Sequence, residues 1–369
     1  MSSTDKSFIP VYSTFLMGNE SKYVNECLTS GWISSKGQFI SRFEKEFSKF
    51  IGVRSSTSVS NGTVGLHLAL KVLGVGPGDE VIVPTLTYIA TVNAILYVGA
   101  QPVFVDSDER TWNLDPKLVE KKINKKTKAI LMVHLYGAPC DVKALAKLAR
   151  ENEIFLIEDA AEAFGSKQDG RYIGTLGDIS VFSFFGNKTI TTGEGGMLVA
   201  NNESLIDRAT HLKSQAVSPT IEYWHEEIGF NYRMTNLCAA IGLAQLELAY
   251  LILDKKRMLA AWYREELHDL PCTFQEEISG DLHSYWMVSI LLRSEFERDN
   301  MREHLRLNGV ETRPIFYPVS SMPVCASVEL FPVANKISKC GMNLPSYPAL
   351  TRDQIGYICS KIREALKGI

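Results

Sequence analysis

Lys188 lies in a sequence context that a surface lysine does not require. It lies in the stretch FFGNKTITTGEGG at 184–196, between the end of an apolar segment and a glycine cluster that lets the backbone turn tightly. Burial in such a place lowers the pKa of the ammonium group, so the amine becomes nucleophilic and later a competent base. The flanking residues therefore predict that Lys188 contacts a bound cofactor.

A carboxylate stands at a comparable place earlier in the chain. Asp159 ends the apolar segment 154–159, and it either pairs with a protonated ring nitrogen or simply faces water or caps the next helix. The strand-like stretch ISVFSFF lies between Asp159 and Lys188. We therefore expect the two side chains at adjacent strand ends of one sheet.

The third feature is the start of a helical pattern at Asn61, Gly62 and Thr63. A helix N-terminus with glycine offers free N–H groups and a favourable dipole to a phosphate, although the same residues also serve as plain helix capping. These three features together fit pyridoxal phosphate: a helix start that can bind phosphate, an aspartate at a strand end and a lysine in a turn before a glycine cluster. The lysine forms a Schiff base, the aspartate holds the pyridinium as an electron sink, and helix amides bind the phosphate.

The elements that must position these groups alternate along the first two thirds of the chain. Short apolar runs at 80–84, 102–106, 129–137 and 154–159 predict buried strands, and the segments between them have helical spacing. Two more strands are expected at 179–185 and 195–202. This order predicts an α/β fold with a largely parallel sheet covered on both faces, and ligands bind outside the carboxyl ends of such strands.

The pattern of the sequence changes after about Gly242. Long helices with many charged residues are expected from there on, and a strand candidate follows at 284–292. We expect three parts: an N-terminal segment at 1–24, a large cofactor-binding domain at 25–249 and a small C-terminal domain at 250–369.

Composition excludes several classes of protein. The 369 residues are 45% hydrophobic and 22% charged, with a net charge of −3, which disfavours a nucleic-acid partner. The seven cysteines have no metal-ligand spacing, so we expect no metal site and free thiols in a reducing, cytoplasmic compartment. No run approaches the roughly 20 apolar residues that cross a bilayer, so no membrane partner is expected.

Three stretches carry a resemblance to a known family. EDAAEAFGS at 158–166, GDISVFSFFGNKTITTGEGGM at 177–197 and FNYRMTNLCAAIGLAQLE at 230–247 resemble the DegT/StrS family of pyridoxal-phosphate sugar aminotransferases. The resemblance covers nearly the whole chain. It implies the aspartate-aminotransferase-like fold, fold type I of the pyridoxal-phosphate enzymes. In this fold a large domain has a mixed, mainly parallel seven-stranded sheet, and a smaller C-terminal α/β domain follows.

By this resemblance, Lys188 is the catalytic lysine that bonds to the cofactor, and Asp159 pairs with the pyridine nitrogen. Tyr88 corresponds to the aromatic residue that stacks on the ring. Glu162 lies near the ring hydroxyl, at a position where many relatives carry glutamine, which leaves its protonation state open.

The same resemblance assigns residues to the cofactor's phosphate. Gly62 and Thr63 offer backbone amides, and Ser183 offers a hydroxyl. Asn231 corresponds to a residue that reaches the phosphate from the neighbouring subunit in relatives. A homodimer with shared active sites is therefore expected, and the sequence does not separate a dimer from a tetramer.

The substrate-side residues are expected at the rim of the pocket. GWISSKG at 31–37 supplies Trp32 and Ser34, and TRPIFYP at 312–318 supplies Arg313, whose guanidinium suits a diphosphate or forms a structural salt bridge. The favoured reaction moves an amino group from L-glutamate to C4 of GDP-4-keto-6-deoxy-D-mannose.

Three alternatives remain open at this stage. The nucleotide could be UDP or dTDP with the same chemistry. A pyridoxamine-dependent sugar 3-dehydratase shares the fold, but those relatives replace the lysine with histidine, so Lys188 argues against it. A regulator that only retains the fold is disfavoured by the complete set of cofactor residues.

Overall fold

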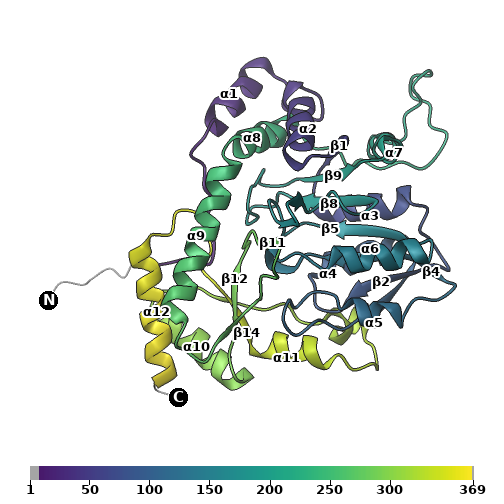
Figure 1. Ribbon diagram of the computed structural model, residues 1–369. Coiled ribbons are helices and arrows are strands. Elements are labelled where there is room, and N and C mark those ends of the chain that lie inside the picture. Colours follow the sequence, from purple (N-terminus) through teal and green to yellow (C-terminus); the bar gives the residue numbers. More distant parts are fainter. Residues whose placement is uncertain (1–7, 368–369) are drawn as a thin grey trace.

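The computed structural model describes residues 8–367, within which a seven-stranded sheet forms the centre of the larger part of the molecule (Figure 1). In sheet order, its strands are β1 (Ser55–Val59), β9 (Gly196–Ala200), β8 (Ile179–Ser183), β5 (Phe155–Asp159), β4 (Thr127–Val133), β2 (Glu80–Pro84) and β3 (Gln101–Val105). The pairings from β3 through β8 are parallel, whereas β9 runs antiparallel to both of its neighbours. The expected mixed, mainly parallel sheet is confirmed.

Most of the strands expected from the sequence form, with several differences. The strand expected at 284–292 is confined to Val288–Leu291. The strand expected at 129–137 ends at Val133, because Leu135–Gly137 forms a 3-10 turn in which Tyr136 has a φ of 56°. The strand β1 was not expected, since its sequence SSTSV is polar. Pairing with the apolar β9 stabilises it instead.

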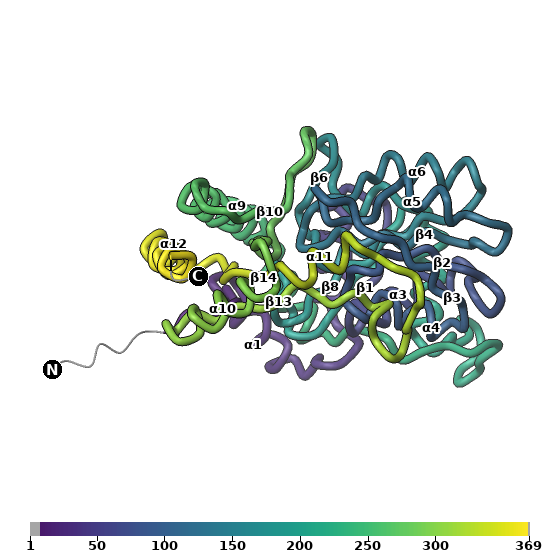
Figure 2. Tube along the Cα trace, turned by 90° about the horizontal axis from the view of Figure 1, so that it is seen from below, coloured from purple at the N-terminus to yellow at the C-terminus, as the bar shows by residue number. Residues whose placement is uncertain are grey.

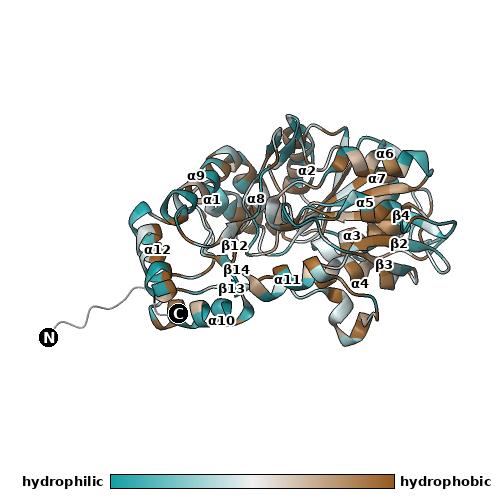
Figure 3. Cartoon of the chain, turned by 60° about the horizontal axis from the view of Figure 1, so that its bottom comes forward, coloured by the Kyte–Doolittle hydropathy of each residue, from teal (hydrophilic) through white to brown (hydrophobic). Residues whose placement is uncertain are grey.

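Helices cover both faces of the sheet because its strands alternate their side chains between the faces. In β2, Val81 and Val83 pack with the helices on one face, and Ile82 packs with those on the other. The helices on the first face are α3 (Gly62–Val72), α4 (Ile89–Tyr97) and α7 (Glu203–Lys213). Those on the second face are α2 (Gln38–Ile51), α5 (Pro116–Glu120), α6 (Val142–Glu151) and α8 (Asn236–Glu247). The strands appear as an apolar layer between these helices (Figure 3).

The C-terminal third builds a second, antiparallel sheet with its own core. Its strands in order are β10 (Thr273–Phe274), β12 (Val288–Leu291), β14 (Gly341–Leu344) and β13 (Arg313–Pro314). The helices of this part are α9 (Ala249–Leu267), α10 (Glu295–Leu307), α11 (Pro332–Cys340) and α12 (Arg352–Lys367). Seen from below, α9, α10 and α12 lie on the side opposite to α3, α4 and α6 (Figure 2).

Among the contacts that join the C-terminal third to the large sheet, two come from a helix junction and from a returning segment. Helices α8 and α9 meet at an angle of 63°. The segment 315–337 returns to the core of the large sheet, where Ile315, Val319 and Ile337 are buried. The C-terminal residues are thereby brought to the carboxyl ends of the large sheet's strands.

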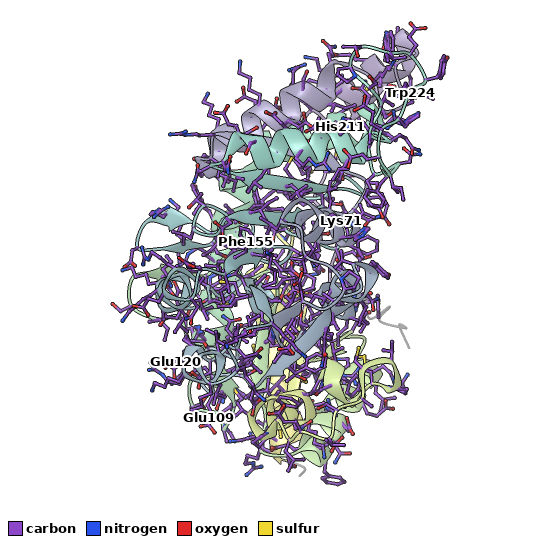
Figure 4. All side chains as sticks on the ribbon, turned by 90° about the vertical axis from the view of Figure 1, so that its right-hand side faces the viewer. Lys71, Glu109, Glu120, Phe155, His211 and Trp224 are labelled. Carbon is purple, nitrogen blue, oxygen red and sulfur yellow. The ribbon has the colours of Figure 1, made fainter. Side chains whose placement is uncertain are left out.

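Smaller elements complete the described chain. They are α1 (Glu20–Ser30), a three-stranded sheet of β11 (Asp281–Leu282), β6 (Lys167–Gln168) and β7 (Arg171–Tyr172), and 3-10 turns at Val319–Ser321 and Pro323–Cys325. The segment 214–232 extends beyond α7, and Trp224 lies near its outer end (Figure 4). Over the range 8–367, no helix taken alone is long and apolar enough to cross a membrane. Only the bent pair α8 and α9, taken together, meets that requirement of length and composition.

Candidate active site

A cavity of about 630 Å³ lies at the carboxyl ends of the large sheet's strands. Eight of the residues expected from the sequence line it. They are Gly62, Thr63, Tyr88, Asp159, Glu162, Ser183, Lys188 and Arg313. The structure thus brings together side chains that are spread over most of the chain.

Lys188 lies in the turn between β8 and β9. Main-chain hydrogen bonds shape this turn, from Lys188 N–H to Phe185 O at 2.9 Å and from Thr192 N–H to Phe184 O at 2.9 Å. The lysine side chain is 14% exposed, and its Nζ lies 3.8 Å from Glu162 Oε1. Burial lowers the pKa of Lys188, while the carboxylates of Glu162 and Asp159 oppose that shift.

Asp159 is the last residue of β5, which pairs with β8, so the expected adjacency of the two strand ends is confirmed. Each of its carboxylate oxygens has a donor: Thr91 Oγ1 donates to Oδ2 at 2.7 Å, and Ala161 N–H donates to Oδ1 at 3.1 Å. Burial raises the pKa of Asp159, and these two donors together with the Lys188 ammonium oppose the rise. The carboxylate is therefore fixed in orientation at the cavity wall.

Glu162 has a different environment. Its Oε2 accepts one hydrogen bond, from Tyr136 N–H at 2.7 Å, and its side chain is 5% exposed. Burial raises the pKa of Glu162 to about 7, against the opposing charge of Lys188. Glu162 can thus gain or lose a proton near neutral pH, beside the amine of Lys188.

The N-terminus of α3 forms the opposite wall of the cavity. The Asn61 side chain caps this helix by accepting from Val64 N–H at 3.0 Å. A Cβ at Gly62 would lie 2.9 Å from the Cβ of Ser183, so only glycine allows the helix start and Ser183 to approach this closely. Free helix N–H groups and a hydroxyl thus face one small space, which suits an oxyanion such as phosphate.

Aromatic residues and Arg313 form the rim. The Tyr88 ring is 57% exposed and lies 5.6 Å from the ring of Phe316, measured between centroids. Arg313 is half-exposed, with Nη2 at 3.8 Å from Glu311 Oε1 and its guanidinium 5.4 Å from the Tyr12 ring centroid. This loose ion pair leaves the guanidinium able to bind an anion.

Three expected site residues lie outside the cavity of the single chain. Trp32 lines a separate open hollow beside the start of α2, and the main-chain oxygen of Ser34 accepts from Asn236 N–H at 2.6 Å. Asn231 is exposed in the segment 214–232, where its Oδ1 accepts from Arg233 Nη2 at 3.0 Å.

Some cavity residues have no signal in the sequence. Tyr136, Trp286 and Asn343 line the cavity but belong to no local pattern that indicates a ligand site. Asn187 and Phe316 also line it, and they lie within the stretches 184–196 and 312–318 that were expected at the site. Tyr136 follows a strand, and Trp286 precedes one in the C-terminal third, so only the fold brings them next to Lys188.

A sequence model of the DegT/DnrJ/EryC1/StrS aminotransferase family matches residues 16–363. The chain is 54% identical to the GDP-perosamine synthase of Escherichia coli O157:H7 over 358 residues. The matched region covers 97% of this chain and 98% of the relative. It is 51% identical over 360 residues to the GDP-perosamine synthase of Vibrio cholerae, with 96% and 98% covered. Among solved structures, the pyridoxal-phosphate form of Spr1654 from Streptococcus pneumoniae matches with a TM-score of 0.92. Its sequence identity is 26%, and 98% of each chain is covered.

Proposed function

Because the chain belongs to the DegT/DnrJ/EryC1/StrS aminotransferase family, we propose that it makes GDP-perosamine for surface polysaccharide such as O-antigen. The enzyme is a pyridoxal-phosphate-dependent nucleotide-sugar aminotransferase. In the proposed reaction, L-glutamate donates the amino group and C4 of GDP-4-keto-6-deoxy-D-mannose receives it. The observation that supports this acceptor is the sequence identity of the chain to two GDP-perosamine synthases, which is 54% and 51% over nearly the whole chain.

The cavity fits pyridoxal phosphate. The close approach of Gly62 to Ser183 places the Ser183 hydroxyl beside the start of α3, and a Cβ at Gly62 would force the two apart. Gly62, Thr63 and Ser183 would hold the phosphate, Asp159 would hold the ring nitrogen, and Lys188 would bond to the carbonyl carbon. When bound, the cofactor supplies the electron sink that allows a proton to leave the amino-acid Cα.

The residues of the chain supply the proton transfers. The Nζ of Lys188 is a buried amine with a lowered pKa. It can therefore take the proton from the Cα of the donor and pass it to another carbon atom in the site. The Glu162 carboxyl group lies 3.8 Å from that amine and can gain or lose a proton near pH 7. The carboxylate of Asp159, held by its two hydrogen bonds, would stabilise a proton on the ring nitrogen.

The test is an assay of the purified protein with glutamate and three acceptors in parallel, the GDP-, UDP- and dTDP-linked 4-keto-6-deoxy sugars. We expect amination of the GDP sugar, with the 3-hydroxyl retained in the product by mass spectrometry. Faster amination of a UDP or dTDP sugar would reject the proposed nucleotide. A 3-deoxy product would reject aminotransfer in favour of dehydration.

We also propose that the enzyme works as a homodimer whose partner completes each cavity. Trp32, Ser34 and Asn231 lie outside the cavity of their own chain, and Asn231 belongs to a projecting segment with exposed apolar side chains. Tyr223 is 91% exposed and Ile228 is 86% exposed in that segment. A surface of this kind is typical of an interface between copies of a chain.

The proposed compartment is the cytoplasm. All seven cysteines are free thiols in the structure, and three of them, Cys27, Cys140 and Cys359, are buried. Free buried thiols suit a reducing compartment. Fractionation of the native host tests this, and recovery of the enzyme outside the cytoplasm would reject it.

A further inference from the structure

The indole of Trp286 covers the amine of Lys188. Trp286 precedes β12 in the C-terminal third, and its side chain reaches back to the turn that carries the lysine. The Nζ of Lys188 lies 3.8 Å from the centroid of the indole ring, and Trp286 is buried. An ammonium group at this distance from an aromatic face is attracted by it, most strongly at a desolvated site.

A second contact ties the indole to the same turn. Trp286 Nε1–H donates to the main-chain oxygen of Asn187 at 2.7 Å, and Asn187 is the residue before Lys188. The indole therefore holds the turn by its edge and the amine by its face. Both contacts act on a lysine whose four-carbon side chain otherwise has many rotamers.

Trp286 is itself held from three directions. Its ring stacks on Tyr136 with centroids 5.9 Å apart and an interplanar angle of 17°. Its main-chain oxygen accepts from Lys256 Nζ at 2.9 Å. The preceding residue, Tyr285, has a φ of 52°, and its N–H donates to His283 Nδ1 at 2.8 Å. A side chain fixed in this way can impose its position on a flexible neighbour.

We propose that Trp286 is a positioning residue for Lys188. It holds the lysine amine over the indole face and anchors the turn at Asn187, so the C-terminal third of the chain controls the group that reacts in the large part. This role rests on the proposed function, in which Lys188 is the reacting amine. The competing explanation is that Trp286 only fills space in the core.

The two explanations predict opposite changes in the pKa of Lys188. If the indole face stabilises the ammonium, replacing it with an apolar side chain that has no ring lowers this pKa by about one unit. If Trp286 only fills space, its loss admits water, which favours the ammonium and raises the pKa. The charged groups that face Lys188, Glu162 and Asp159, are the same in both cases.

The measurement uses cofactor-free protein and needs no sugar substrate. Acetylation of Lys188 by acetic anhydride is followed by peptide mass spectrometry across a pH series, and the midpoint of the rate gives the pKa. Accessibility changes the plateau of this profile but not its midpoint. A failure of the GDP-sugar assay would leave this result unaffected, so the two proposals fail separately.

Three variants are compared with the wild type. Trp286→Leu should lower the midpoint by about one unit, and Trp286→Phe, which keeps a ring face, should lower it less. Trp262→Leu is the matched control, because Trp262 lies in α9 with its ring 5.6 Å from the Arg352 guanidinium. The control should leave the midpoint unchanged. An unchanged or raised midpoint in Trp286→Leu, or an equal fall in the control, would overturn the proposal.

A second measurement keeps the test decisive if Trp286→Leu does not fold. In the protein labelled with ¹⁵N, the Nε1–H signal of Trp286, identified by its loss in Trp286→Phe, should shift with the pKa of Lys188. The shift should vanish in Lys188→Met. Lys256 also contacts Trp286 and titrates near pH 7, so the shift is measured in a Lys256→Met background. A titration that is the same with and without Lys188 in that background would show that the indole does not sense this amine.

Discussion

Replacing Lys256 with methionine should change how the stability of the protein depends on pH. Lys256 lies in α9 with 2% of its surface exposed, and its Nζ donates to the main-chain oxygens of Trp286, at 2.9 Å, and Ser346. Burial lowers the pKa of Lys256 from 10.5 to about 7. Above pH 7 the folded protein therefore carries a neutral amine, while the unfolded chain still binds the proton.

The sign and size of the effect follow from this difference. Between pH 7 and 10.5 the unfolded state binds more protons, so the free energy of unfolding rises with pH. A shift of 3.5 units at 1.36 kcal/mol per unit gives a rise of about 5 kcal/mol as an upper limit. The neighbouring His283 adds nothing in this range, because burial and nearby positive charges hold its pKa well below its usual value.

The assay is urea unfolding at fixed protein concentration, at pH 7, 8, 9 and 10. The stability of Lys256→Met relative to the wild type should fall steadily as the pH rises, because the variant lacks the titrating group. Near pH 7 the two proteins should differ little, since methionine removes a buried charge but leaves two carbonyl oxygens without a donor. Lys255→Met, one residue away in α9 and less buried, is the control and should run parallel to the wild type. Parallel profiles for Lys256→Met and the wild type would refute the reasoning.

Three further predictions concern the site itself. Glu162→Gln keeps the acceptor for Tyr136 N–H but cannot ionise, so the pH dependence of kcat/KM near 7 should disappear and the pKa of Lys188 should fall. An unchanged pH profile would count against a role for that proton. Lys188→His should still bind pyridoxamine phosphate but lose aminotransfer by more than the roughly 10²–10⁴-fold typical of one acid–base group; undiminished amination would contradict the assignment. Asn231→Ala should weaken cofactor binding in equilibrium dialysis, and its equimolar mixture with Lys188→Ala should regain roughly a quarter of the wild-type activity if subunits of a symmetric dimer exchange randomly. No recovery after demonstrated exchange would exclude shared sites.

The sequence predicts the parts of this site that depend on local patterns. Asp159 and Lys188 each follow an apolar run, and parallel pairing of β5 with β8 brings both run ends to the same edge. Gly62 precedes a long helical pattern, which the structure has as α3. In each case a short-range signal specifies an element, and the rule for parallel sheets then specifies where its end lies.

The parts that could not be predicted depend on contacts between distant segments. Trp286 lies about a hundred positions after Lys188 in the chain, and its preceding residue adopts a left-handed backbone that no pattern indicates. The strand β1 is polar in sequence, and its pairing with β9 is a contact between segments that are far apart in the chain. Trp32, Ser34 and Asn231 lie outside the cavity of a single chain, so in the proposed homodimer their contribution would come from a second copy.

The two acids of the cavity differ in what their surroundings allow them to do. Asp159 accepts two hydrogen bonds, which orient its carboxylate and oppose the rise in its pKa that burial causes. Glu162 accepts one, and burial raises its pKa to about 7. Pairs of titratable groups whose environments separate their pKa values can divide charge stabilisation from proton exchange. Asp159 is therefore held in one orientation at the cavity wall, while Glu162 can exchange a proton near neutral pH beside the amine of Lys188. A glutamine at position 162 would keep the geometry of that arrangement and remove its second proton site, which is why the Glu162→Gln profile separates the two tasks.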